Sequence, residues 1–98
     1  MLALSLKTEY GDLPTLKRIV SDGLSEERKK ILYALDKTSG IIKNFETKYN
    51  LSSEEFLKKF KKAEIDDNGD SFEWWAELKV IKELEEKLEI IEDIEICQ

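Results

Sequence analysis

Four oxygen-bearing side chains in the middle of the chain have the spacing of a calcium-binding loop. Asp66, Asn68, Asp70 and Glu77 occupy the first, third, fifth and twelfth positions of the loop that binds Ca²⁺ between two helices. That loop requires glycine at its sixth position for a sharp turn, and this chain has Ser71 there. Because the turn that gathers the oxygen ligands is missing, we expect an acidic connection between helices and no bound metal.

Elsewhere, too, the sequence supplies little for catalysis. The chain has no histidine, and its one cysteine, Cys97, has no basic neighbour in the sequence that would activate a thiol. The carboxylates and lysines form no recognisable nucleophile or phosphate-binding motif. We therefore expect no enzymatic activity and no cofactor. A single cysteine without histidine also excludes an intramolecular disulfide and a Cys/His zinc site.

Length and composition indicate one small domain of 98 residues. Hydrophobic residues make up 41% of the chain and charged residues 39%, a balance that suits helices with solvated faces or an oligomer. No apolar run approaches the roughly 20 residues that cross a bilayer. Residues 1–4 also lack the basic start of a secretory signal. We expect a cytoplasmic protein that has no contact with a membrane.

The net charge of −6 is concentrated in the second half of the chain. Residues 1–50 contain nine Lys/Arg and seven Asp/Glu, whereas residues 51–98 contain seven and fifteen. Because carboxylates repel phosphates, we do not expect nucleic acid as a ligand of the acidic half. A basic protein would fit this charge. A solvated Glu/Lys helix face is the simpler alternative.

The first fifty residues predict a short strand followed by helices. Polar and apolar residues alternate at the N-terminus, with Leu2, Leu4, Leu6, Thr8 and Tyr10 on one face. Asp12 and Pro14 predict the start of a short helix that ends at Gly23. A longer helix should follow over about residues 25–50, with a bend, a close crossing or a break at Ser39-Gly40. Its apolar positions are spaced for packing on another helix and predict a self-association seam made of Ile31, Leu35, Thr38, Ile42, Phe45 and Tyr49.

Two further helices are predicted in the second half. Ser52 and Glu55 form a capping box, and Leu51 can pack on Phe56. After the acidic connection, Asp70 or Ser71 should cap a last helix with Glu and Lys at most outward positions. From residue 88 the pattern shifts toward alternation, so the last residues either leave the helix as an extended tail or form a frayed helix end. An extended tail could add to the sheet edge of another protein.

Trp74 and Trp75 point about 100° apart on a helix, so only one of them can lie at the centre of the core. Phe72, Trp75 and Leu78 share one stripe, which assigns Trp75 to the core and leaves Trp74 as a candidate partner contact. Packing of Trp74 on Phe45 or Tyr49 explains its presence equally well.

These patterns predict an all-α or mostly α protein, a small helical hairpin or bundle with a short N-terminal strand and an acidic C-terminal helix or tail. Residues 1–98 would form a single domain. Within it we expect the strand and short helix at 1–23, the long and the capped helix at 25–65, and the acidic helix and tail at 71–98. The predicted partner-binding residues combine apolar anchors with carboxylates: Trp74, Leu78, Ile81, Glu85, Leu88, Glu89, Ile91, Glu92, Ile94, Glu95 and Ile96.

Part of the chain resembles a family of antitoxin-like small proteins from archaea and bacteria, which are encoded beside a small toxin. The resemblance rests on residues 45–56, on Lys59-Phe60, on the acidic connection and on residues 72–76, and it extends over about residues 42–85. Family members commonly have an acidic or aromatic residue where this chain has Ser71. The resemblance implies a non-catalytic protein that covers the active surface of a toxin, often a basic nuclease.

Two other functions fit parts of the sequence. A structural helical protein would oligomerise through the seam of residues 31–49. Alternatively, the order of strand, short helix, glycine turn and longer helix over the first fifty residues is that of a ribbon-helix-helix repressor, whose paired strands enter the major groove of DNA. The outward strand positions, however, offer only one cation, Lys7.

Overall fold

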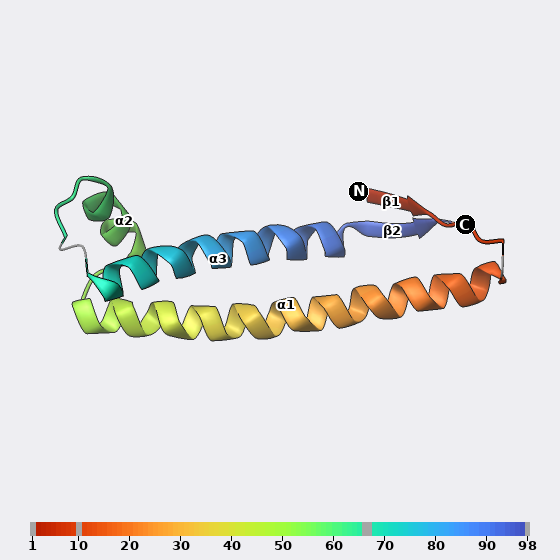
Figure 1. The fold of residues 1–98 in the computed structure, drawn as a ribbon, viewed down its shortest axis with the longest axis horizontal. Helices are drawn as coiled ribbons and strands as arrows, with labels where there is room; N and C mark the ends of the chain where they lie inside the picture. The colour runs from red at the N-terminus through yellow and green to blue at the C-terminus, as the bar shows by residue number, and fades with distance from the viewer. Residues whose placement is uncertain (1, 10, 66–67, 98) are drawn as a thin grey trace.

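The computed structural model of this chain describes residues 2–9, 11–65 and 68–97, and for residues 95–97 the backbone alone. In chain order its elements are β1 (Leu2–Ser5), α1 (Leu13–Tyr49), α2 (Ser53–Lys61), α3 (Gly69–Glu92) and β2 (Ile94–Cys97). Helices α1 and α3 lie antiparallel along a molecule with extents of 59 × 21 × 18 Å (Figure 1). The predicted mostly α hairpin with a short N-terminal strand is confirmed.

Helix α1 begins where the sequence predicts and then continues through Gly23 and through Ser39-Gly40. The Asp12 carboxylate accepts a hydrogen bond from the Thr15 amide at 2.6 Å, and Pro14 lies in the first turn. The prediction that Gly23 ends a short helix is wrong, since α1 is continuous to Tyr49. Glycine in a helix interior costs only about 1 kcal/mol relative to alanine. Half-buried Val20 and Leu24 on either side of Gly23 can offset that cost.

The predicted self-association seam lies inside the hairpin. Ile31, Thr38, Ile42 and Phe45 are buried, and Leu35 is half-buried, on the side of α1 that packs against α3 of the same chain. Tyr49, at the end of the seam, is 43% exposed. Apolar residues with a/d spacing predict that a helix covers them, without specifying whether it belongs to the same chain. Here α3 already covers them.

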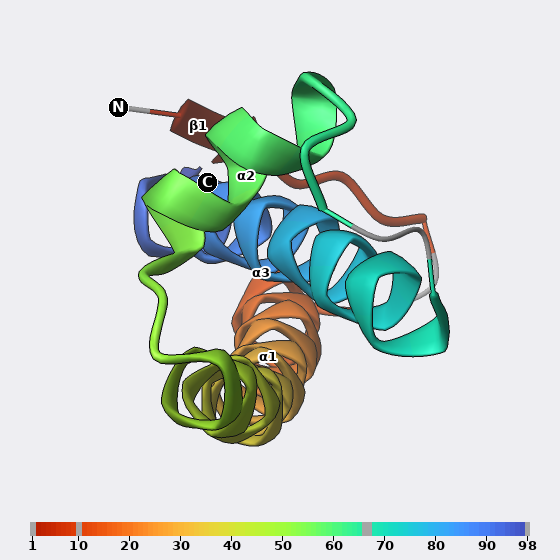
Figure 2. The same cartoon turned by 90° about the vertical axis from the view of Figure 1, so that its left-hand side faces the viewer.

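Helix α2 lies across one end of the hairpin, as Figure 2 shows. The Ser52 half of the predicted capping box is present, because Ser52 Oγ accepts a hydrogen bond from the Glu55 amide at 3.1 Å. The Glu55 carboxylate accepts a hydrogen bond from the Ser52 hydroxyl at 3.2 Å. The cap of α3 differs from the prediction. Asn68, and not Asp70 or Ser71, is the N-cap, and its Oδ1 accepts a hydrogen bond from the Ser71 amide at 2.9 Å.

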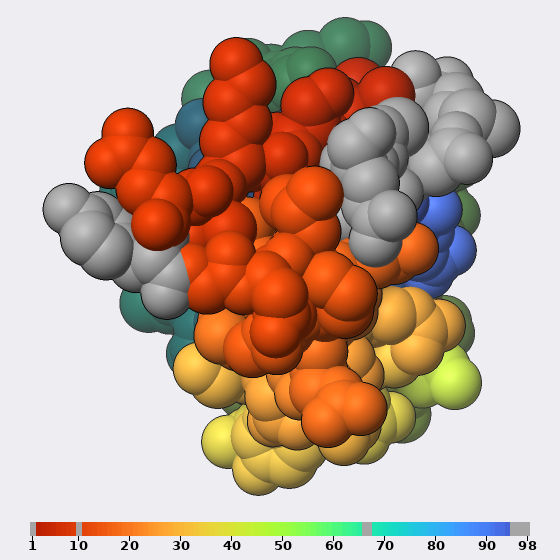
Figure 3. Space-filling view, turned by 90° about the vertical axis from the view of Figure 1, so that its right-hand side faces the viewer, coloured from red at the N-terminus to blue at the C-terminus, as the bar shows by residue number. Residues whose placement is uncertain are grey.

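The C-terminal tail is extended, one of the two predicted outcomes, and it pairs within its own chain. Strand β2 lies parallel to β1, with Leu2 opposite Ile94 and Ser5 opposite Cys97. The N-terminal strand is shorter than the alternating pattern indicates, since Leu6 and Thr8 lie beyond it. Tyr10 falls outside the described residues. In the space-filling view of Figure 3, the N-terminal segment that follows β1 and the first turns of α1 form much of the surface at this end of the molecule.

Candidate protein-binding surface

Trp74 forms the centre of an aromatic cluster that joins the three helices. Its side chain is 1% exposed and stacks on Phe56 at a centroid distance of 4.0 Å and on Phe45 at 5.7 Å. Tyr49 stacks on the same ring at 6.1 Å. The assignment of Trp75 to the core and Trp74 to a partner is therefore wrong, and the alternative, packing of Trp74 on Phe45 or Tyr49, is what the structure shows. Trp74 is not available to a partner.

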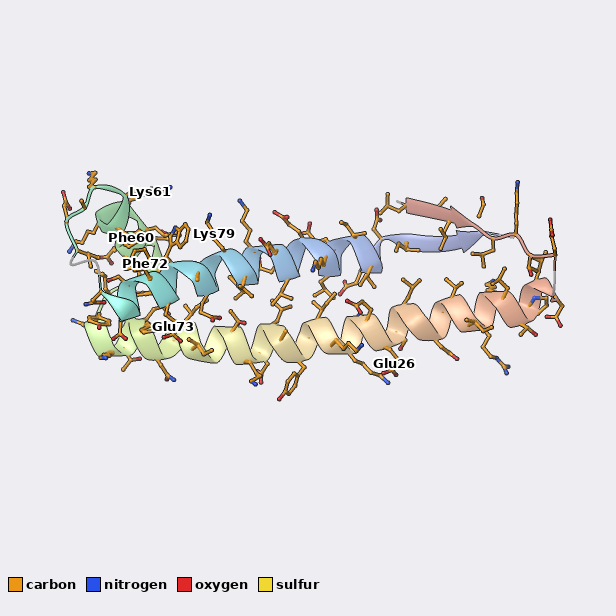
Figure 4. The ribbon with its side chains drawn as sticks, in the orientation of Figure 1. Glu26, Phe60, Lys61, Phe72, Glu73 and Lys79 are labelled. Carbon is orange, nitrogen blue, oxygen red and sulfur yellow. The ribbon has the colours of Figure 1, made fainter. Side chains whose placement is uncertain are left out.

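Trp75 takes the more exposed position beside this cluster. Its ring stacks against Phe60 at 6.2 Å, and the Lys79 ammonium lies 4.1 Å from its centroid. Phe72 is 52% exposed and meets Phe60 edge-on at 6.2 Å. Figure 4 shows Phe60, Phe72 and Lys79 gathered where α2 meets α3. This group of aromatic side chains docks α2 on the hairpin.

The carboxylate of Asp70 joins the start of α3 to the end of α1. Its Oδ2 accepts hydrogen bonds from the Lys48 ammonium at 2.6 Å and from the Tyr49 hydroxyl. The hydrogen bond from Lys48 and, to a smaller extent, that from Tyr49 lower the pKa of Asp70. The hydrogen bond to Asp70 in turn raises the pKa of Lys48. Two of the four residues in the calcium-like spacing are thus engaged otherwise, because Asn68 caps α3 and Asp70 binds α1.

The structure does not describe the whole of that calcium-like spacing. Asp66 lies outside the described residues. Within the part of the chain that the structure describes, no three His, Cys, Asp or Glu side chains are grouped so that they could hold a metal ion.

Most of the apolar residues predicted to bind a partner pack inside the hairpin. Leu78, Ile81, Leu88 and Ile91 are half-buried on α3, which packs along α1. Ile94 in β2 is also half-buried. The predicted contacts Glu95 and Ile96 belong to β2, and their side chains are not described. The amphipathic stripe of α3 is therefore largely used for intramolecular packing.

The predicted carboxylates of α3, in contrast, face solvent. Five exposed glutamates and one exposed lysine occupy the C-terminal turns of α3, which gives a local net charge of −4. We call these carboxylates the acidic stretch: Glu83, Glu85, Glu86, Glu89 and Glu92. The Glu92 Oε1 lies 3.6 Å from Arg28 Nε of α1, an ion pair that is half-exposed on both sides. In Figure 1 these turns have no other element over the side that faces away from α1.

Ile90 is an exposed apolar residue between the glutamates of the acidic stretch, and it is not among the predicted partner-binding residues. Its side chain is 52% exposed, whereas neighbouring Ile91 is half-buried. Adjacent residues on a helix point about 100° apart, so only one of the two isoleucines can face α1. That rule, applied to Ile90-Ile91, could have found the exposed residue.

Fold and surface together define a small helical-hairpin protein with an acidic exposed helix. No protein-family model matches the chain, and neither a curated protein nor a solved structure matches it. Among the described residues, no helix combines the length and apolarity needed to cross a membrane.

Proposed function

We propose that this chain is a non-catalytic, antitoxin-like protein that binds and neutralises a small basic protein. The observation that supports this function best is the acidic stretch, with Ile90 exposed in its midst. The proposed binding surface differs from the one expected from the sequence, because it lacks Trp74 and includes Ile90. The half-buried residues of α3 that pack along α1 contribute less to this surface: Leu78, Ile81, Leu88 and Ile91.

The charge of the acidic stretch suits a basic partner for a physical reason. A concentration of one sign of charge accelerates association with an oppositely charged protein and fixes its orientation, more than it raises affinity by itself. An exposed apolar residue among these charges can supply contact area that excludes water once the partner is bound. The resemblance of residues 42–85 to antitoxin-like proteins leads to the same class of partner.

The first test uses the protein encoded by the neighbouring gene, if that protein is small and basic. We expect the two proteins to co-elute in size-exclusion chromatography and to bind with an affinity that falls as salt increases. Growth arrest caused by the basic protein should be relieved when this chain is co-expressed. The absence of a small basic neighbour, or a failure of the two proteins to associate, would exclude the proposal.

Charge reversal tests whether the basic partner binds to the acidic stretch. The double substitution Glu85→Lys/Glu89→Lys should weaken binding by about tenfold or more, mainly through slower association. The matched control Asp22→Lys/Asp36→Lys changes the net charge equally at two exposed positions of α1. Equal weakening by both pairs would show a non-specific charge effect and would contradict docking on the acidic stretch.

Neither alternative function has equal support. The ribbon-helix-helix comparison needs a turn between two helices at Gly23, and α1 is continuous there. A scaffold that oligomerises through the seam of α1 would first have to displace α3.

A further inference from the structure

Within the described part of the chain, strand β1 is paired along only one of its two edges. The Leu2 amide donates a hydrogen bond to the Asp93 carbonyl at 2.8 Å, in a parallel ladder with Leu4 opposite Ile96. In such a ladder each second residue directs both its N–H and its C=O to the neighbouring strand. Leu2 and Leu4 therefore face β2, and the backbone groups of Ala3 and Ser5 face the opposite way. No strand among the described residues lies beyond that edge (Figure 1).

The free edge of β1 is short, but its residues carry neither the charge nor the proline that commonly protects an edge strand. Its sequence, Leu-Ala-Leu-Ser, contains no charged residue and no proline. All four residues are exposed, with Leu2 at 46% and Leu4 at 38%. Natural edge strands usually carry lysine, proline or a bulge that prevents pairing with another chain. A sheet of two four-residue strands is also marginal by itself.

We propose that β1 pairs with β1 of a second copy of this chain, antiparallel and about a two-fold axis at Leu4. In this register Ala3 lies opposite Ser5 of the second copy, and the two residues exchange both backbone hydrogen bonds. The symmetric pair does the same, so four hydrogen bonds form. The result is a four-stranded sheet in the order β2, β1, β1, β2.

Charge and symmetry select a second copy as the occupant. Because β1 is neutral, two copies of it meet without repulsion, whereas the basic partner proposed above would find no opposite charge there. Pairing about a two-fold axis satisfies the free groups of both edges at once. Each copy carries a net charge of −6, so the dimer should strengthen as salt increases, opposite to the salt dependence expected for the basic partner.

Cysteine cross-linking tests the register. In this pairing Leu4 faces its own equivalent in a non-hydrogen-bonded pair, where the Cα atoms lie about 4.5 Å apart, within the range of a disulfide. In a Cys97→Ser background, Leu4→Cys should form a covalent dimer under mild oxidation. Ala3→Cys is the control, because Ala3 faces Ser5 of the second copy and not itself. No cross-link at Leu4, or equal cross-linking at both positions, would overturn the proposed register.

Proline substitution tests the edge without a new thiol. Ala3→Pro removes an N–H that points away from β2, so the ladder within the chain remains. Because two of the four intermolecular hydrogen bonds are lost, the dissociation constant measured by sedimentation should rise about tenfold or more. Helix content by circular dichroism should not change. A wild-type protein that stays monomeric at high concentration and high salt, or a dimer insensitive to Ala3→Pro, would contradict the proposal.

Discussion

The indole Nε1 of Trp74 donates a hydrogen bond to Ser53 Oγ at 3.1 Å, which joins the first turns of α3 and α2. Ser53 is fixed in turn, because its amide and its hydroxyl both donate to Glu46 Oε2 of α1, each at 3.0 Å. One polar chain, next to the aromatic cluster, therefore connects all three helices.

Substitution of Trp74 should destabilise the fold more than substitution of its neighbour. We expect Trp74→Phe to lower the free energy of unfolding by about 1 to 2 kcal/mol, because it removes the hydrogen bond and part of a buried ring. Trp75→Phe should change it by less than about 0.5 kcal/mol, since Trp75 is only half-buried. Urea denaturation measures both. A larger loss for Trp75→Phe would contradict the placement of Trp74 at the centre.

The contact between Ser53 and Glu46 should contribute to stability independently of the Ser52 cap of α2. Glu46→Ala leaves both Ser53 donors without their acceptor, and we expect a loss of about 1 kcal/mol in stability. The control is Glu54→Ala, which removes an exposed carboxylate directly after Ser53 in the sequence. Thermal unfolding compares the two variants, and equal effects would show that the interhelix hydrogen bonds contribute little.

Asp70 should make stability depend on pH at the acid end. Its pKa in the folded chain is lowered by the hydrogen bonds from Lys48 and Tyr49, so its contribution is present above the unfolded pKa of about 3.9 and is lost as the pH falls through the folded value. Asp70→Asn should therefore be less stable than wild type at pH 7, and the difference should shrink below about pH 4. Denaturation series at pH 3 and pH 7 measure the difference in unfolding free energy between the variant and wild type. Asp36→Asn, at an exposed position, is the control. A difference that is constant with pH would contradict the ionic contact.

Gly23 tests the continuity of α1. The structure places it inside the helix, where an added Cβ meets no atom within 4 Å. Gly23→Ala should therefore stabilise the protein by up to about 1 kcal/mol. If Gly23 ended a helix in a left-handed conformation, the same substitution would destabilise the protein, so the sign of the change in unfolding free energy decides between the two structures.

The sequence predicted local features such as helix caps better than it predicted which residues pack against each other. Asp12 and Ser52 cap helices through bonds to residues three positions away, so nearby sequence is sufficient to identify them. The choice between Trp74 and Trp75 depends on which face of α3 meets α1. Two stripes with spacings of three and four residues pass through this segment, and periodicity does not distinguish them.

Sequence patterns also did not identify which elements cover the apolar seam of α1 and pair with the C-terminal tail. An apolar seam on α1 shows that something packs there, and an extended tail shows that something pairs with it. The structure supplies α3 and β1 from the same chain for these roles. The exposed glutamates of α3 were predictable, because charged residues at outward helical positions require no knowledge of the partner element.

The pairing of β1 with β2 joins residues that lie 92 positions apart in the sequence, as Leu2 and Ile94 do. Closing so long a segment costs entropy that only a few ladder bonds offset, whereas the end of α1 and the start of α3 are separated by the much shorter segment of residues 50–68. The helices should therefore assemble early and the ladder last. On unfolding the order reverses, and the termini would separate while the helices are still packed.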